Sequence, residues 1–142
     1  MKVFKNVMIA LLIIGLSAFI ISFGLVGLRS LDTKIDYEEI INKYAEEYNS
    51  DPLMIASIIK VESGFDTEAV SEMNAKGLMQ ILPHTGEWIA AKLEEDYHDE
   101  LLHDPDYNIK LGAYYYEYLY EYFGDESLAL AAYNGGMGNV EQ

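Results

Sequence analysis

One carboxylate in the sequence occupies a position where a charge is costly. Ile55, Ile58 and Ile59 recur at helical spacing, and Glu62 follows at the next turn on the same face. Removing a carboxylate from water without a partner raises its pKa, because the charged form loses its hydration. In a cleft, such a group is the general acid that can protonate a glycosidic oxygen near neutral pH. The alternative, that the helix ends at Glu62 and the side chain reaches water, stays open on periodicity alone.

The residues around and after Glu62 form three ordered blocks. They are Glu62-Ser-Gly-Phe65 with Ser71, Ala75-Lys-Gly-Leu-Met-Gln-Ile81 and Pro83-His-Thr85; Asn108-Ile109 with Gly112 and Tyr115; and Ala131-Ala-Tyr-Asn-Gly-Gly136 with Gly138-Asn-Val140. These blocks resemble the catalytic region of lytic transglycosylases of the soluble-lytic-transglycosylase (SLT) type, which is related to goose-type lysozyme. The likeness runs from about Tyr37 to Val140, and it implies a small all-α, lysozyme-like domain.

The resemblance implies roles for five residues. Glu62 is similar to the single catalytic acid/base of the family, and Ser71 to the serine that helps position the sugar near the scissile bond. Gln80 matches the glutamine of the G-L-M-Q motif, which lines the cleft, and Tyr133 matches the tyrosine near the catalytic carboxylate. Asn134 lies in the same block as a candidate substrate-binding residue, although holding the turn fits it better.

A single carboxylate implies a particular reaction. Ordinary glycosidases need two carboxyl groups, and the nearby Asp66, Glu68 and Glu72 read as solvated loop charges. In the resembled family the substrate assists. The enzyme cleaves the β-1,4 bond between N-acetylmuramic acid and N-acetylglucosamine of peptidoglycan, leaves a 1,6-anhydro end, and uses no water, metal or cofactor. A muramidase that adds water with the same glutamate is a rival, and so is a weakly active glycan-binding scaffold in an envelope-spanning apparatus.

Composition excludes several other classes of function. The 142-residue chain has a net charge of -15 and no cysteine, and residues 29–142 hold all 24 acidic side chains but only 7 basic ones. Nucleic-acid binding needs clustered Lys and Arg, and thiolate chemistry needs Cys. The three histidines, His84, His98 and His103, do not form a metal-ligand spacing. Among the many tyrosines of residues 114–122, we expect one or two to line the cleft and others to be core.

The N-terminal residues have the pattern of a membrane anchor. Residues 7–28 carry no charge, and at ~1.5 Å per residue they can cross a hydrocarbon core of ~30 Å. We expect a cytoplasmic lead (1–6), an uncleaved transmembrane signal-anchor (7–28), a tether (29–36) and a domain (37–142) on the extracytoplasmic side of a bacterial cell membrane. A cleaved secretory signal and a buried core helix are the alternatives.

Periodicity and capping signals predict the helices of the domain. Asp36 with Glu39 reads as a capping box, Asp51-Pro52 starts the next helix, and Asp106 begins a long helix that Gly124 closes. Further helices are expected at about 85–95 and 127–133, with residues 66–84 irregular and 98–104 a polar loop. The chain stops directly after the third block, where relatives usually continue through another helix. The sequence is therefore expected to be either a fragment or a domain whose fold is completed without that further helix.

Overall fold

Aspartate side chains cap the starts of three helices in the computed structural model, which describes residues 36–141. Its helices are α2 (Glu38–Glu47), α3 (Pro52–Glu62), α4 (Pro83–Lys92), the 3-10 helix η1 (Asp99–His103), α5 (Pro105–Phe123), α6 (Glu126–Gly135) and α7 (Met137–Val140). The described residues contain no strand, only isolated bridges that pair Lys76 with Val70 and with Ile81. The all-α prediction is confirmed for this range. The predicted lead, anchor and tether up to residue 35 lie outside it.

Two of the predicted helix starts are wrong. α5 begins two residues earlier than expected, because Asp104 accepts a hydrogen bond from the Tyr107 backbone N–H at 3.0 Å and Pro105 occupies the first helical position. At α2 the residue before the helix is Tyr37, with a left-handed φ of 63°, and no side chain caps it. The predicted start of α3 is confirmed, since Asp51 accepts from the Leu53 N–H at 2.8 Å.

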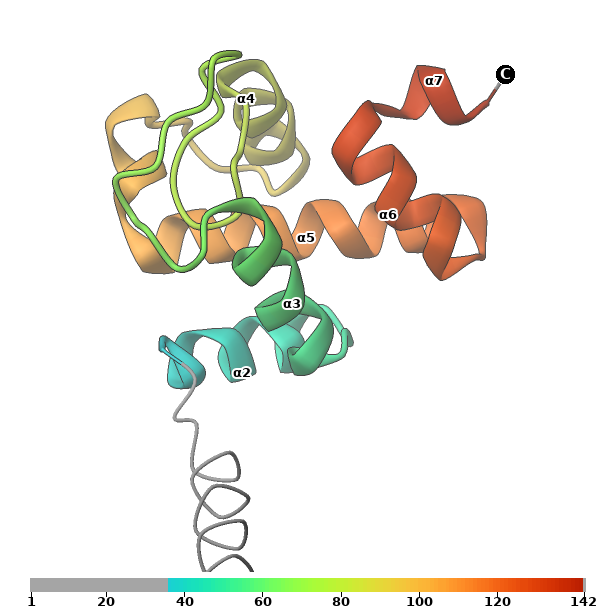
Figure 1. Ribbon diagram of the computed structural model, residues 1–142, viewed down its shortest axis with the longest axis horizontal. Coiled ribbons are helices and arrows are strands. Elements are labelled where there is room, and N and C mark those ends of the chain that lie inside the picture. The colour runs from blue at the N-terminus through green and yellow to red at the C-terminus, as the bar shows by residue number, and fades with distance from the viewer. Residues whose placement is uncertain (1–35, 142) are drawn as a thin grey trace, which may run out of the picture. The chain divides into compact units, whose positions relative to one another are not determined.

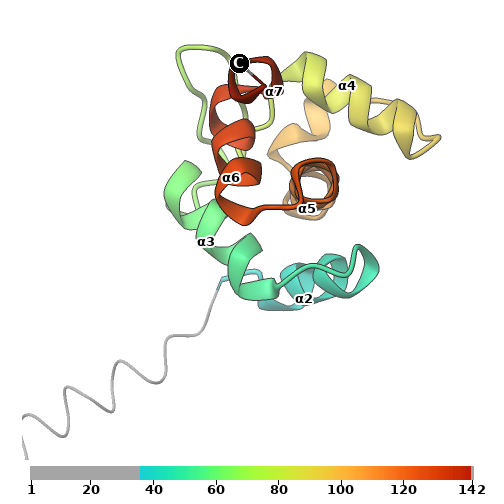
Figure 2. The same ribbon diagram turned by 90° about the vertical axis from the view of Figure 1, so that its right-hand side faces the viewer.

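Helix α5 is the centre of the domain. α2, α4, η1 and α6 all pack against it, and Figure 2 looks almost along its axis with the other helices around it. Its inward face is fully buried at Ile109, Leu111 and Leu119. Most of the segment expected to be a polar loop is instead the 3-10 helix η1, and its residue Leu102 is fully buried. No helix of the described range combines the length and apolarity needed to cross a membrane.

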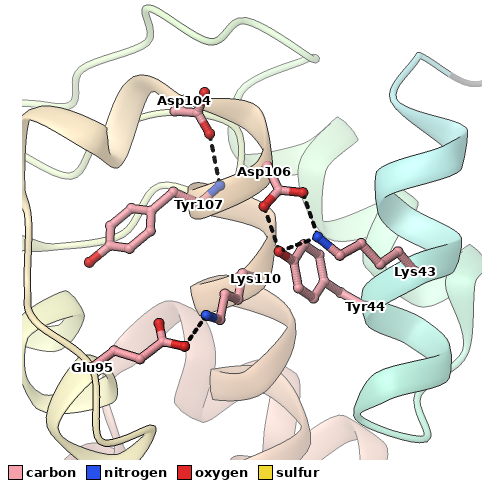
Figure 3. Close-up of polar contacts among 7 residues, drawn as sticks. All are labelled: Lys43, Tyr44, Glu95, Asp104, Asp106, Tyr107 and Lys110. Atoms are coloured by element: carbon pink, nitrogen blue, oxygen red, sulfur yellow. Dashed lines mark hydrogen bonds and ion pairs between the residues drawn. The ribbon is translucent and has the colours of Figure 1, made fainter.

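A polar cluster joins α2 to the start of α5. The Tyr44 hydroxyl donates to one carboxylate oxygen of Asp106 at 2.6 Å, and Lys43 Nζ donates to the other at 2.9 Å (Figure 3). Burial alone would raise the pKa of Asp106, but these hydrogen bonds outweigh it and the pKa is lowered. The predicted cap residue Asp106 is therefore a tertiary anchor for α2. On the neighbouring turn, Lys110 pairs with Glu95 from the segment after α4.

Candidate active site

Glu62 is the last residue of α3 and lines a cleft. Ile55 and Ile59 are fully buried on the inner face of this helix, and Glu62 is half-buried. No described residue gives the carboxylate a hydrogen bond or an ion pair, and burial raises its pKa. Both sequence interpretations of Glu62 are thus partly right. The helix does end there, yet the side chain keeps a partly apolar environment.

The cleft has a volume of about 840 Å³ and brings together all five predicted site residues, Glu62, Ser71, Gln80, Tyr133 and Asn134. They come from segments that are far apart in the chain. One wall, the segment wall, consists of residues 69–82 and the first turns of α4. The opposite wall, the helical wall, consists of α6 and α7, and Tyr115 of α5 lies between the two. Figure 1 shows these elements above α5.

A buried asparagine fixes the segment wall. Asn108 of α5 is fully buried; its Oδ1 accepts from the Met79 N–H at 2.7 Å, and its Nδ2 donates to the Lys76 and Leu102 carbonyls at 2.9 and 2.7 Å. The backbone at position 77 lies so close to Leu102 that only glycine fits there. Its φ is +73°, and a Cβ would lie 2.2 Å from the Leu102 carbonyl oxygen. The motif residues Asn108 and Gly77 therefore hold an irregular segment in one conformation.

Ser71 and Gln80 line the cleft and also hold its wall. The Ser71 hydroxyl accepts from the Ala75 N–H at 3.0 Å. Gln80 has a positive φ of 50°, and its Nε2 donates to the carbonyls of Ala69 and Gly77 at 3.1 and 2.9 Å. Both hydrogens of the Gln80 amide are thus used by the protein. Its Oε1, which has no hydrogen-bond partner among the described residues, is the atom left to accept from a ligand.

Tyr133 connects the two walls beside Glu62. Its hydroxyl donates to the Met79 carbonyl at 2.8 Å, which ties α6 to the segment that Asn108 holds. Burial, together with the negative charge of Glu62, raises the pKa of the Tyr133 phenol well above its ordinary value. The phenol is therefore neutral at physiological pH, and its oxygen can still accept a hydrogen bond near the carboxylate.

Asn134 is exposed at the edge of the cleft, and no described residue bonds to its side chain. The turn that it was expected to hold is closed instead by the Gly136 N–H, which donates to the Ala132 carbonyl at 2.8 Å, and by Asn139, whose amide donates to the Gly135 carbonyl at 2.6 Å. The side chain of Asn134 is free to contact a ligand.

Glu62 is the only acidic residue among those that line the cleft within residues 36–141. Asp66, Glu68 and Glu72 are exposed, as expected of loop charges. A pair of carboxylates facing each other across a substrate, which ordinary retaining and inverting glycosidases use, is not found in this cleft. Within the described residues, this cleft therefore offers one carboxyl group for acid or base chemistry.

Trp88 lies within the helix predicted at about 85–95 but was not predicted as a site residue. It lines the cleft from α4, with Tyr115 on one side and the apolar Leu82 in the same wall. An apolar residue at helical spacing carries no signal that separates core from cleft, so only the tertiary packing could reveal this position. Tyr115 does line the cleft, as expected of one or two tyrosines on this helix.

Comparison with known proteins identifies the class of this domain. The model of the family described as "Transglycosylase SLT domain" matches residues 39–142. Membrane-bound lytic murein transglycosylase C of Actinobacillus pleuropneumoniae is 34% identical over 115 residues, covering 73% of this chain and 32% of the relative. Soluble lytic murein transglycosylase of Salmonella typhimurium is 32% identical over 108 residues, covering 73% and 17%.

Solved structures agree. The lytic transglycosylase Slt of Pseudomonas aeruginosa, solved as an inactive mutant, matches with a TM-score of 0.72 and 32% identity, covering 75% of this chain and 18% of that one. The 70 kDa soluble lytic transglycosylase of Escherichia coli matches with a TM-score of 0.72 and 29% identity, covering 76% and 18%. The chain belongs to the SLT transglycosylase domain family, which confirms the resemblance seen in the motifs. It spans about a third of the first relative's length and under a fifth of the others'.

Proposed function

We propose that this protein is a lytic transglycosylase that cleaves peptidoglycan between N-acetylmuramic acid and N-acetylglucosamine, with Glu62 as its acid and base. The observation that carries the proposal is the state of Glu62. It is the sole carboxylate lining the cleft in the described range, half-buried and unpaired, with a raised pKa. A raised pKa favours the protonated carboxyl group, which is the form that can donate a proton to a glycosidic oxygen. Membership of the SLT family supports the same reaction.

The reaction then proceeds in two steps with one protein group. Protonated Glu62 donates its proton to the glycosidic oxygen as the bond from that oxygen to C1 of the muramic sugar breaks. The 2-acetamido carbonyl of the same sugar stabilises the positive charge that develops at C1. The ionised Glu62 next accepts the proton of the C6 hydroxyl, whose oxygen bonds to C1 and closes the 1,6-anhydro ring. Glu62 is protonated again, and no water is consumed.

Other cleft residues would support these steps. Gln80 Oε1 and the exposed amide of Asn134 can hydrogen-bond the hydroxyl and acetamido groups of the sugars. The Ser71 hydroxyl, which already accepts from the Ala75 N–H, can donate a hydrogen bond to a substrate oxygen. Tyr133 oxygen can accept a hydrogen bond near the carboxylate. These roles are positioning roles, since none of these groups gains or loses a proton in the reaction.

The test is the mass of the products. The full chain, purified in detergent, is incubated with isolated peptidoglycan as wild type, Glu62→Gln and Glu117→Gln. Glu117 is a matched control, because burial also raises its pKa but it lies outside the cleft. We expect wild type and Glu117→Gln to release muropeptides one water lighter than hydrolysis products, and Glu62→Gln to lose at least about 100-fold in rate.

Other results would give different answers. Products of full hydrolytic mass that depend on Glu62 would identify a muramidase. Binding to peptidoglycan without release of products would identify a glycan-binding scaffold. Release that continues undiminished in Glu62→Gln would refute the role of this residue.

We also propose that the domain is held at a membrane, on its extracytoplasmic side, by residues 7–28. The support is the uncharged run in the sequence, and one relative is named as membrane-bound. Fusion of residues 1–35 to a reporter that is active only outside the cytoplasm tests the topology. An active reporter that fractionates with membranes is expected, and a silent one would refute the orientation.

A further inference from the structure

Three aromatic side chains line the cleft within the described residues, and Trp88 on α4 is the largest of them. Trp88 is the only tryptophan in the sequence, and it is half-buried on α4 rather than in the core. Its ring meets those of Tyr118 and Tyr115 edge to face, with centroids 4.9 and 6.2 Å apart. A large aromatic surface that lines a cleft and remains partly in water is costly unless something covers it.

A continuous row of rings connects Trp88 to the carboxylate. Trp88 contacts Tyr115, and the Tyr115 ring lies 5.4 Å from that of Tyr133 at an angle of 45°. Tyr133 in turn is close enough to Glu62 for the carboxylate charge to act on its phenol. Trp88 and Tyr133 are therefore linked through the ring of Tyr115, and all three side chains line the same cleft as Glu62.

The Trp88 ring is held in place before any ligand binds. Besides the two tyrosines, Lys92 lies one helical turn further along α4, with its Nζ 5.5 Å from the Trp88 ring centroid. A side chain that is already ordered loses little conformational freedom on binding, so its contacts contribute more fully to affinity. Lys92 also places a positive charge beside Trp88 in a domain whose net charge is strongly negative.

We infer that Trp88 forms a sugar-binding subsite of the cleft, separated from Glu62 by the rings of Tyr115 and Tyr133, where its ring stacks on the pyranose face of an N-acetylated amino sugar. The C–H groups of a pyranose face are apolar and slightly positive, and they suit the electron-rich face of an indole. The inference rests on the proposed function, since the ligand is the glycan strand. Trp88 acts as a specificity and positioning residue for longer strands, not as a catalytic residue.

The single tryptophan makes a direct binding experiment possible. The full-length Glu62→Gln chain is titrated with β-1,4-linked N-acetylglucosamine oligomers of increasing length while its tryptophan emission is recorded. Because all the tryptophan signal comes from Trp88, a saturable change in emission reports a ligand at this ring. We expect such a change with long oligomers and a much smaller one with the disaccharide. Calorimetric titration measures the binding independently.

Turnover kinetics separate a subsite from a structural role. Trp88→Ala should raise the KM for long strands about ten-fold with little change in kcat, while Trp88→Phe should recover most of the loss. Tyr120→Ala removes an exposed ring outside the cleft and should leave both constants unchanged. A merely structural loss would instead lower kcat and the thermal midpoint without depending on substrate length.

The outcomes distinguish this inference from the proposed function. If wild type releases anhydro products and calorimetry detects oligomer binding, but Trp88 emission does not change and Trp88→Ala keeps its KM, the subsite is overturned and the function stands. If neither turnover nor binding is found in the wild type, both are overturned. Length-dependent emission changes together with the KM effect of Trp88→Ala establish the subsite.

Discussion

The two walls of the cleft are built in opposite ways. The part of the segment wall before α4, residues 69–82, has almost no regular secondary structure, yet Asn108 and Gln80 hydrogen-bond its backbone and Gly77 packs closely against Leu102. The helical wall of α6 and α7 is regular, but α7 contains no buried residue. A Cβ added at Gly135 or Gly136 would meet nothing within 4 Å. Regular secondary structure and rigidity are therefore separate properties here. The irregular wall is held in place by more hydrogen bonds than its lack of helix suggests, because side chains satisfy its backbone groups.

The largest loss of stability is expected from Asn108→Ala. This change leaves the Met79 N–H and the Lys76 and Leu102 carbonyls without their buried partner. We expect the free energy of unfolding to fall by about 3–5 kcal/mol, measured by urea denaturation followed through Trp88 emission. Asn134→Ala, on the helical wall, is the control and should change it by less than about 0.5 kcal/mol. Equal effects of the two substitutions would refute the contrast between the walls.

Two glycine substitutions test the same contrast through the backbone. Gly77→Ala forces a Cβ to within 2.2 Å of the Leu102 carbonyl oxygen at a left-handed φ, and should cost about 2–4 kcal/mol. Gly135→Ala places its Cβ where nothing lies within 4 Å, in the last turn of α6. It should be neutral or stabilise the fold by up to about 1 kcal/mol, since alanine restricts the unfolded chain. Thermal denaturation of both variants gives the comparison, and destabilisation by Gly135→Ala alone would contradict it.

Tyr133→Phe breaks a hydrogen bond that joins the walls. The Met79 carbonyl loses the donor at 2.8 Å, so we expect a loss of about 1 kcal/mol in stability. A larger effect on peptidoglycan turnover, about ten-fold, would follow if the hydroxyl also keeps α6 in register with Glu62. Tyr120→Phe, whose hydroxyl has no hydrogen-bond partner in the described range, should change neither quantity. Unaltered stability in Tyr133→Phe would argue against a joint between the walls.

The smallest expected effect is a pH dependence from Glu62. Its pKa is raised in the folded state, so the folded protein binds this proton more tightly than the unfolded chain does. The proton's contribution to stability is full below the unfolded pKa and is lost as the pH rises through the folded value. Glu62→Gln should therefore become more stable than wild type as the pH increases, by a difference that disappears in acid. Urea denaturation at several pH values measures it, and a constant difference would contradict the raised pKa.

The same titration has a consequence for activity. The proposed reaction starts from the protonated carboxyl group, so turnover should fall as the pH rises through the folded pKa of Glu62. Buffers that span this range, with the Glu117→Gln variant as a reference, separate the effect of Glu62 from a general loss of stability.

Local signals in the sequence predicted the helices well and their first residues less well. Asp51 caps α3 as expected, because a cap is an interaction between residues two or three positions apart. Two aspartates near the start of α5 could each cap the helix. Asp104 is the cap, whereas Asp106 accepts hydrogen bonds from Lys43 and Tyr44 of α2, which lie some sixty positions earlier in the chain. Asp104 with Pro105 repeats the pattern of Asp51 with Pro52, so a local rule does favour Asp104 as the cap. Only the contact of Asp106 with α2 depends on how the helices pack.

The sequence by itself determined the family, the all-α class and the conflict at Glu62, where a carboxylate follows an apolar helix face. These depend on residue type and on periodicity along one helix. Only the tertiary structure decided that Glu62, Ser71, Gln80 and Tyr133 line one cleft, that Asn108 holds its wall, and that Trp88 belongs to it. The physical reason is that a buried asparagine or a cleft tryptophan has the same local pattern as a core residue. Its role is set by the segments that pack against it.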